Sequence, residues 1–334
     1  MKSRVVLILP LLSVVLVTAH LLPSLAQKAA APAAGSGAPP PSNPLKVALL
    51  KWYRAGQVAR FPVGKQPYGA AFDGANIWVA NGASGTVTKL RASDGALLGT
   101  FPAGTAPYGV TFDGANIWVS GLGGTVTKLR GSDGKILGSF TVDPTAGWMA
   151  FDGANVWVPV APSQGNGSVV QLRASDGKNL GSFTVGGGPI AAAFDGANVW
   201  FTNQTSYKAG TVTKLRASDG VVLGTFNVGA TPLGITFDGA NIWTANSGDG
   251  SVTKLRASDG TLLGTFDVSF EPYGVAFDGV DIAVTDGLGA VTALRASDGK
   301  LIGNVQLPGA TTGIAFDGAN LWVSAFNANF AGKL

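Results

Sequence analysis

The sequence predicts an all-β protein, a seven-bladed β-propeller of four-stranded antiparallel blades. Three observations support this: a Phe-Asp-Gly marker that recurs every 39 to 43 residues, Asp-Gly turns that separate short β-type segments, and chain ends that resemble parts of one repeat. A period near forty residues made of β-type segments is typical of propellers with one blade per repeat. The marker begins at Phe72, Phe112, Phe151, Phe194, Phe237, Phe277 and Phe316.

Each repeat divides into four β-type segments, as its first complete copy shows. Residues 68–72 and 77–80 are mostly apolar, as expected for inner strands that neighbouring blades cover on both faces. Residues 86–91 alternate between apolar and polar side chains, which is typical of a half-exposed strand, and residues 97–101 complete the blade. The tight turns between segments carry Asp-Gly, in which glycine supplies the positive φ that such a turn requires.

The two ends of the repeat region look like parts of one blade. Residues 47–51 align with a third strand and residues 61–64 with a fourth strand, while residues 314–324 provide a first and a second strand. Pairing of the two ends would close the ring and remove its open sheet edges. Residues 331–334 resemble the start of another third strand, which would compete with the N-terminal one or flank it.

Residues 1–26 have the pattern of a secretory signal peptide. Lys2 and Arg4 precede an apolar run, and the segment ends in a small-x-small cleavage motif. An uncleaved membrane anchor is the alternative, although Pro10 and His20 interrupt the run. In either case we expect an extracytoplasmic domain, periplasmic or secreted, with no stable membrane insertion once the signal is removed.

The rest of the chain divides into a linker and one repeat domain. Residues 27–45 are rich in Ala, Pro, Gly and Ser, which predicts a flexible linker, and residues 46–334 form the propeller. The chain has no cysteine, and its only histidine is His20 in the signal segment. This excludes disulfides and cysteine nucleophiles, and it argues against histidine catalysis in the mature chain. No basic tract suggests nucleic acid, and we expect a monomer.

The motifs FDGANIWVAN and VTKLRASDG resemble those of bacterial exported propellers with YVTN or NHL repeats. The resemblance covers residues 47–334 and implies the fold but no single activity, because propellers host many functions. Two enzyme families are distantly similar. Virginiamycin B lyases use a histidine base and magnesium, and the mature chain has no histidine. Gluconolactonase-type lactonases hold a divalent cation through Glu, Asn and Asp, and in this chain Glu271 is the only glutamate. A quinone cofactor is not expected, because Gly138 stands where pyrroloquinoline-quinone repeats carry tryptophan.

Most acidic and tryptophan residues have a structural explanation. Of 19 acidic residues, seven lie in Phe-Asp-Gly and six in Ser-Asp-Gly, where a carboxylate can accept bonds from nearby backbone N–H groups. Calcium in every turn is the alternative, but it takes about six to eight oxygens and each turn offers one carboxylate. Tryptophan recurs in the second strand and is expected to pack between blades, with sugar platforms as the alternative. These residues are Trp78, Trp118, Trp157, Trp200, Trp243 and Trp322, and the sixth repeat has Ala283 instead.

Six acidic residues lie outside these turns: Asp143, Asp249, Asp267, Glu271, Asp281 and Asp286. All but Asp281 fall in or beside connections from a second to a third strand, or from a fourth strand to the next blade. Both kinds of connection emerge on one face of a propeller, which we name the loop face. The Asp-Gly turns emerge on the opposite face, the turn face.

Aromatic residues also concentrate on the loop face. Tyr68, Tyr108 and Tyr273 occupy one position at the start of first strands, Trp148 lies beside that position in another repeat, and a long loop contains Tyr207. Loops on a rigid scaffold commonly carry binding residues. We predict a ligand site formed by Tyr68, Tyr108, Trp148, Tyr273, Glu271, Asp143, Asp286 and Tyr207. The alternative is a solvated rim plugged by aromatic side chains.

These residues support two main functional hypotheses. The first is a non-catalytic binding or scaffold module that engages a protein or a carbohydrate through the loop face. The second is a metal-assisted lactonase or lyase with Glu271, Asp286 and Asn246 as oxygen ligands of calcium or magnesium, since a hard cation needs no histidine. A structural cell-surface protein is a third possibility. We predict no catalytic residue, and no cofactor beyond that divalent cation.

Overall fold

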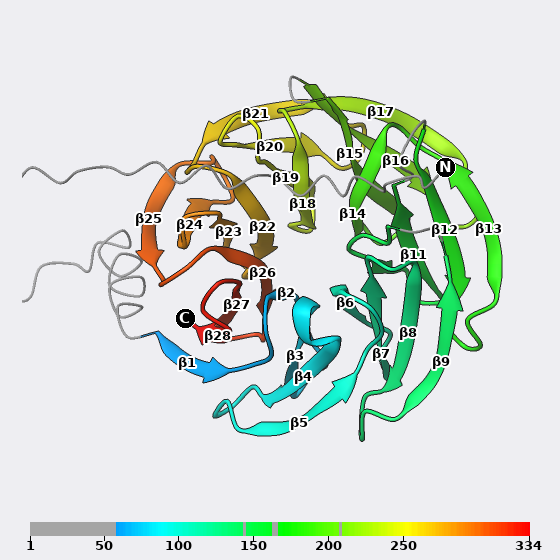
Figure 1. Cartoon of the computed structure of the whole chain (residues 1–334). Coiled ribbons are helices and arrows are strands. Elements are labelled where there is room, and N and C mark those ends of the chain that lie inside the picture. The colour runs from blue at the N-terminus through cyan, green and yellow to red at the C-terminus, as the bar shows by residue number, and fades with distance from the viewer. Residues whose placement is uncertain (1–57, 143–144, 162–165, 207–208) are drawn as a thin grey trace, which may run out of the picture. The chain divides into compact units, whose positions relative to one another are not determined.

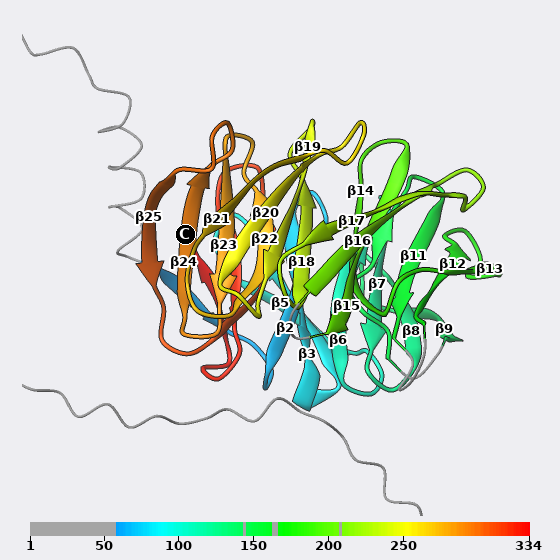
Figure 2. The same cartoon turned by 90° about the horizontal axis from the view of Figure 1, so that it is seen from above.

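The computed structural model describes residues 58–142, 145–161, 166–206 and 209–334. Within these residues the strands form seven antiparallel sheets of four strands each, arranged as a ring (Figure 1), which confirms the predicted propeller. Seen from the side, the strands run between two faces that carry the connections (Figure 2). The described residues include no helix with the length and apolarity that a membrane span requires.

Six blades consist of consecutive strands, ordered from the central channel outwards. Blade 1 has β2 (Pro67–Phe72), β3 (Asn76–Asn81), β4 (Thr86–Arg91) and β5 (Leu97–Pro102), with the short 3-10 helix η1 (Gly82–Ser84); blade 2 has β6 (Pro107–Phe112), β7 (Asn116–Gly121), β8 (Thr125–Arg130) and β9 (Ile136–Thr141); blade 3 has β10 (Ala150–Phe151), β11 (Asn155–Val160), β12 (Ser168–Arg173) and β13 (Asn179–Thr184). Blade 4 has β14 (Gly188–Phe194), β15 (Asn198–Ser206), β16 (Ala209–Arg216) and β17 (Val222–Val228); blade 5 has β18 (Pro232–Phe237), β19 (Asn241–Asn246), β20 (Ser251–Arg256) and β21 (Leu262–Asp267); blade 6 has β22 (Pro272–Phe277), β23 (Asp281–Asp286), β24 (Ala290–Arg295) and β25 (Leu301–Gln306).

Blade 7 is closed by both ends of the chain, but not in the predicted division. Its inner three strands are β26 (Thr311–Phe316), β27 (Leu321–Ala325) and β28 (Phe330–Lys333), and its outermost strand is β1 (Ala59–Pro62). The prediction that the N-terminal side supplies the third strand was wrong, because β28 pairs with both β27 and β1 and so occupies that place. Residues 47–51, the predicted third strand, lie outside the described residues.

The inner strands of neighbouring blades contact one another in an unbroken circle through β2, β6, β10, β14, β18, β22 and β26. Apolar clusters fill the spaces between blades and include the six second-strand tryptophans, which are 0% exposed. This burial confirms that these indoles are packing residues.

An aspartate–tryptophan hydrogen bond fastens the first turn of six blades to the second strand. In blade 1, Asp73 Oδ2 accepts from Trp78 Nε1 at 2.7 Å, while Asp73 Oδ1 accepts from the backbone N–H groups of Ala75 and Asn76 at 2.9 and 2.7 Å. The structural explanation of the Phe-Asp-Gly carboxylates is therefore confirmed. The other pairs are Asp113–Trp118, Asp152–Trp157, Asp195–Trp200, Asp238–Trp243 and Asp317–Trp322.

A lysine on the third strand then connects the indole to the next blade. Lys89 Nζ lies 4.9 Å from the Trp78 ring centroid and donates to the carbonyl oxygens of Gly131 and Ser132 in the outer turn of blade 2, at 2.6 and 3.2 Å. We call this lysine and its carbonyl acceptors the latch. The other latch lysines are Lys128, Lys214, Lys254 and Lys333.

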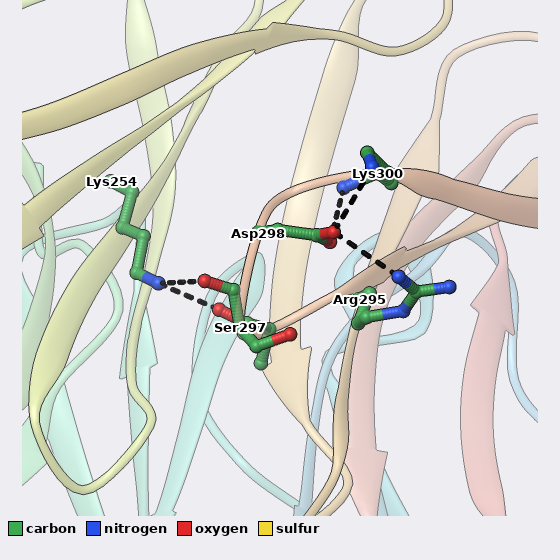
Figure 3. Close-up of polar contacts among 6 residues, drawn as sticks. Lys254, Arg295, Ser297, Asp298 and Lys300 are labelled. Atoms are coloured by element: carbon green, nitrogen blue, oxygen red, sulfur yellow. Dashed lines mark hydrogen bonds and ion pairs between the residues drawn. The ribbon is translucent and has the colours of Figure 1, made fainter.

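Figure 3 shows the latch between blades 5 and 6, where Lys254 donates to Ser297 in the turn after β24. Within that turn Asp298 accepts from Arg295 at 3.1 Å, which stiffens the backbone that the lysine contacts. An outer-strand phenylalanine completes each contact. The ring of Phe266, for example, fills the space beside Gly299, so this turn has no room for a side chain at the glycine.

Blade 6 lacks the three residues that make the latch contact in other blades. Ala283, Ala293 and Val305 stand at the positions of the tryptophan, the lysine and the phenylalanine, as the strand registers show. The reason is topological. A latch grips the turn between the third and fourth strands of the next blade, and in blade 7 those strands, β28 and β1, are not consecutive in the chain. This triple replacement was a signal in the sequence that β28 closes the ring.

We expect Lys89→Met to lower the free energy of unfolding by about 2 kcal/mol, because a charge-assisted hydrogen bond is lost and the Gly131 carbonyl remains buried without a donor. Lys135→Met is the matched control, since Lys135 is exposed in the same turn of blade 2. Denaturant titration of both variants measures the difference. Equal midpoints for the two variants would contradict a stabilising role for the latch.

Stability should also fall in acid. Burial raises the pKa of Asp73, but hydrogen bonds from Trp78, Asn76 and the backbone outweigh burial and hold the pKa below its usual value. Asp195, Asp238 and Asp317 behave alike. A carboxyl with a lowered folded pKa stabilises the fold above its unfolded pKa, and this contribution is lost as pH falls through the folded value. We therefore expect the free energy of unfolding to decline below about pH 4. Denaturant titrations across this range test the decline, and an unchanged midpoint in acid would refute it.

Candidate functional site

Aromatic side chains from five blades converge at the loop-face end of the central channel. Tyr68 begins β2, Tyr108 begins β6, Tyr273 begins β22, Trp148 precedes β10 and Phe326 follows β27. The ring centroids of Tyr68 and Tyr108 are 4.9 Å apart, those of Tyr108 and Trp148 are 5.6 Å apart and stacked, and those of Trp148 and Tyr273 are 5.3 Å apart, edge to face. These five residues are named the aromatic cluster.

Four members of the aromatic cluster were predicted from the sequence, because they differ from the repeat at the start of the first strands. Phe326 was missed. Its ring centroid lies 4.9 Å from that of Tyr68. The available signal was that Phe326 follows the second strand of blade 7, where blade 1 has Gly82.

Two phenols meet across the channel. Tyr108 Oη and Tyr273 Oη are 2.9 Å apart, so one donates a hydrogen bond to the other. Burial raises the pKa of Tyr108 to about 12. Burial, together with the neighbouring Tyr108, raises the pKa of Tyr273 well above its usual value. Both phenols are therefore neutral at physiological pH.

Trp148 brings an unsatisfied donor to the aromatic cluster. Its backbone N–H donates to Ile190 O at 2.8 Å and its carbonyl accepts from Ala192 N at 2.9 Å, so the inner edges of blades 3 and 4 are paired at this point. This pairing lies between two blades without a latch, since Gln171 replaces the lysine in blade 3. Trp148 Nε1 is buried and has no acceptor among the described residues. A buried donor without a partner costs about 1–3 kcal/mol, so an acceptor brought by a ligand would be favourable.

Asp286 and Asn246, two of the predicted metal ligands, are engaged elsewhere. Asp286 is 1% exposed, and its Oδ1 accepts from the backbone N–H groups of Leu288 at 2.9 Å and Ala290 at 2.7 Å. Asn246 is 0% exposed and donates to Thr253 Oγ1 at 2.9 Å. Asp286 thus holds the loop after β23, and Asn246 joins the end of β19 to β20.

Glu271, the third predicted metal ligand, is exposed on the loop face beside blade 6. Among the described residues, no three His, Cys, Asp or Glu side chains lie close enough to share a metal ion. Asp143 and Tyr207, the remaining predicted site residues, lie outside the described residues. The structure thus gathers four of the predicted aromatic residues into one cluster, whereas Asp286 and Asn246 are hydrogen-bonded within their own blades.

Comparison with known proteins identifies the fold. No family model matches the chain, and no curated protein matches it. Among solved structures, the chain is similar to Kuenenia stuttgartiensis hydrazine synthase, with a TM-score of 0.72, 15% identity, and coverage of 80% of this chain and 95% of that chain. It is also similar to a streptogramin B lyase, with a TM-score of 0.68, 17% identity, and coverage of 83% and 96%. The expected distant similarity to lyase-type propellers is therefore confirmed for the fold.

Tyr108→Phe should remove a phenol that ionises near pH 12, since burial raises the pKa of Tyr108 to about that value. An ultraviolet titration of phenolate absorbance measures this step against the wild type. Because the pKa is raised in the fold, the stabilisation from this neutral phenol is present below the unfolded pKa near 10 and is lost as pH rises through the folded value. If the absorbance step that disappears in Tyr108→Phe lies near the ordinary phenol pKa of about 10, the Tyr108 hydroxyl is exposed to solvent and the expectation is wrong.

Proposed function

We propose that this protein is an exported, non-catalytic binding propeller that engages a protein or carbohydrate ligand through its loop face. The observation that carries the proposal is the aromatic cluster with the unsatisfied Trp148 Nε1 at the channel mouth. Aromatic rings offer a large apolar surface, and the indole N–H adds a directional donor to it. Export rests on the signal pattern of residues 1–26.

Binding is favoured over catalysis by the chemistry of the available groups. The described residues contain no histidine or cysteine. The phenols of Tyr108 and Tyr273 have raised pKa values, so they are weak sources of phenolate at neutral pH. Asp286 accepts hydrogen bonds from the loop it occupies. A rigid scaffold with aromatic residues at its mouth and no poised acid–base pair suits recognition.

The similarity to a streptogramin B lyase favours a second candidate, a metal-assisted lyase or lactonase at the channel mouth. This candidate needs Glu271, Asp286 and Asn246 to surround a calcium or magnesium ion. The side chains do not favour that role, because Asp286 and Asn246 are buried at the ends of β23 and β19, in different blades, and are hydrogen-bonded there. We therefore rank it below the binding function.

Glycan and peptide arrays probed with the whole purified chain test the proposal. Trp148→Ala should weaken binding of the strongest array ligand by about tenfold or more, as expected for a central aromatic contact. Trp148→Phe keeps an aromatic ring and removes the indole N–H, so it reports whether a ligand accepts from Nε1. Leu97→Ala is the control, because Leu97 is exposed on β5, the outermost strand of blade 1, which forms part of the outer wall of the ring.

Calorimetric titration with the same array ligand gives the affinities of the three variants. Empty arrays, or equal affinities for Trp148→Ala and wild type, would rule out ligand binding at the aromatic cluster.

A further inference from the structure

Two large apolar side chains are exposed on the loop face of blade 6. Phe270 is 60% exposed and Leu288 is 63% exposed, whereas most other exposed large apolar residues lie at the start of the outer strands. Phe270 lies in the connection from blade 5 to blade 6, and Leu288 lies in the loop between β23 and β24. Exposed apolar groups that gather on one face often mark an interaction site.

The backbone beneath Phe270 is a platform that recurs in four blades. A residue before a proline adopts a left-handed conformation, with φ between 47° and 51°, and its carbonyl accepts a hydrogen bond from the loop after the second strand. In blade 6 the residue is Glu271, and its carbonyl accepts from Gly287 N at 3.1 Å. The corresponding residues in the other blades are Gln66, Ala106 and Thr231.

Neighbouring bonds fix the second half of the platform. Leu288 N donates to Asp286 Oδ1 at 2.9 Å, and Gln306 Nε2 donates to Leu288 O at 2.7 Å. Glu271 Oε2 lies beside Gly287, only 2.9 Å from where a side-chain Cβ would stand. Phe270, Glu271 and Leu288 are thus presented from one rigid support, and we name them the rim patch.

Among the four blades with this platform, only blade 6 has a large apolar side chain at the position of Phe270. At the position of Phe270, the blades with the same platform have Lys65, Thr105 and Ala230. The shared backbone explains the platform but not the phenylalanine. Because the scaffold does not need an exposed ring at this position, the ring is available for a partner.

The charge around the rim patch is of one sign. Residues 246–250, 267–272 and 286–290 contain four acidic residues and no lysine or arginine. Asp249 accepts from Ala230 N, and Asp286 is buried, so the free charges are Asp267 and Glu271, both exposed. A partner that covers the rim patch would gain from a positive charge next to its apolar group.

We propose that the rim patch docks a partner protein through a segment in which an aliphatic or aromatic side chain is flanked by lysine or arginine. A carbohydrate fits less well, because Phe270 and Leu288 offer no hydrogen-bonding group and Glu271 only accepts. Since the hydrogen-bonded support already fixes the patch, docking orders little of the propeller, which favours affinity. This inference rests on the proposed binding function and narrows its ligand to a protein.

The test probes the whole chain with an array of short synthetic peptides, each with one Leu, Phe or Trp flanked either by Lys and Arg or by Glu. Basic-flanked peptides should bind preferentially. The double variant Phe270→Ser/Leu288→Ser should weaken binding by at least about tenfold. The matched control is Leu97→Ser/Leu301→Ser on the outer wall, where the side chains are 62% and 63% exposed, and it should bind like the wild type. Denaturation midpoints confirm that all variants fold.

Glu271→Gln should weaken binding at low salt and flatten its salt dependence, with Asp267→Asn as a comparison on the same face. A preference for Glu-flanked peptides, or full binding by the rim-patch double variant, would overturn the inference.

If Trp148→Ala weakens peptide binding and the double variant does not, the proposed function stands and the rim patch fails. If the double variant alone weakens binding, the rim patch stands and the aromatic cluster loses its role. If the protein binds no peptide and no glycan on the arrays, both proposals are refuted.

Discussion

The interaction on which most of the ring depends is a buried indole, held in five blades between a carboxylate of its own turn and a lysine that reaches the next blade. In blade 1 the chain of contacts runs from Asp73 through Trp78 and Lys89 to the carbonyls of blade 2. It joins an anion and a cation through an aromatic ring, in a place that water scarcely reaches. It also explains why the Phe-Asp-Gly marker and the outer Ser-Asp-Gly turn recur together, since one supplies the carboxylate and the other the acceptor carbonyls.

The same interaction fixes how the ring can close. Lys333 of blade 7 donates to Ala92 O and Ser93 O of blade 1, so the last strand is tied forward as well as paired with β1. A latch lysine in blade 6 would have no acceptor turn in blade 7, because no turn links β28 to β1. Alanines, Ala283 and Ala293, accordingly stand at the tryptophan and lysine positions of blade 6. These two blades are joined by an apolar cluster that includes Leu307 and Val323, and by a buried hydrogen bond from Thr285 Oγ1 to Thr312 O at 2.6 Å.

Because the blades are so similar, the residues that differ between them are the candidates for a functional role. The aromatic cluster arises where first strands of several blades begin, and the circular arrangement alone brings Tyr108 of blade 2 to Tyr273 of blade 6. The rim patch uses a conformation that four blades share and changes only the side chains on it. Both features combine a rigid backbone with local substitution, which suits recognition more than acid–base chemistry.

The sequence by itself determined the number of blades, the strands of blades 1 to 6 and the face that carries the unusual residues, because turn chemistry and strand alternation are local properties of the chain. It did not determine which segment supplies the third strand of blade 7, although Ala283 and Ala293 carried that information, because the signal is meaningful only once the latch is known. Nor could it show that Asp286 and Asn246 are hydrogen-bonded within their own blades, that Phe326 packs against Tyr68, or that Trp148 Nε1 lacks an acceptor among the described residues. These facts depend on which side chains meet across the ring, and only the tertiary structure decides such long-range contacts.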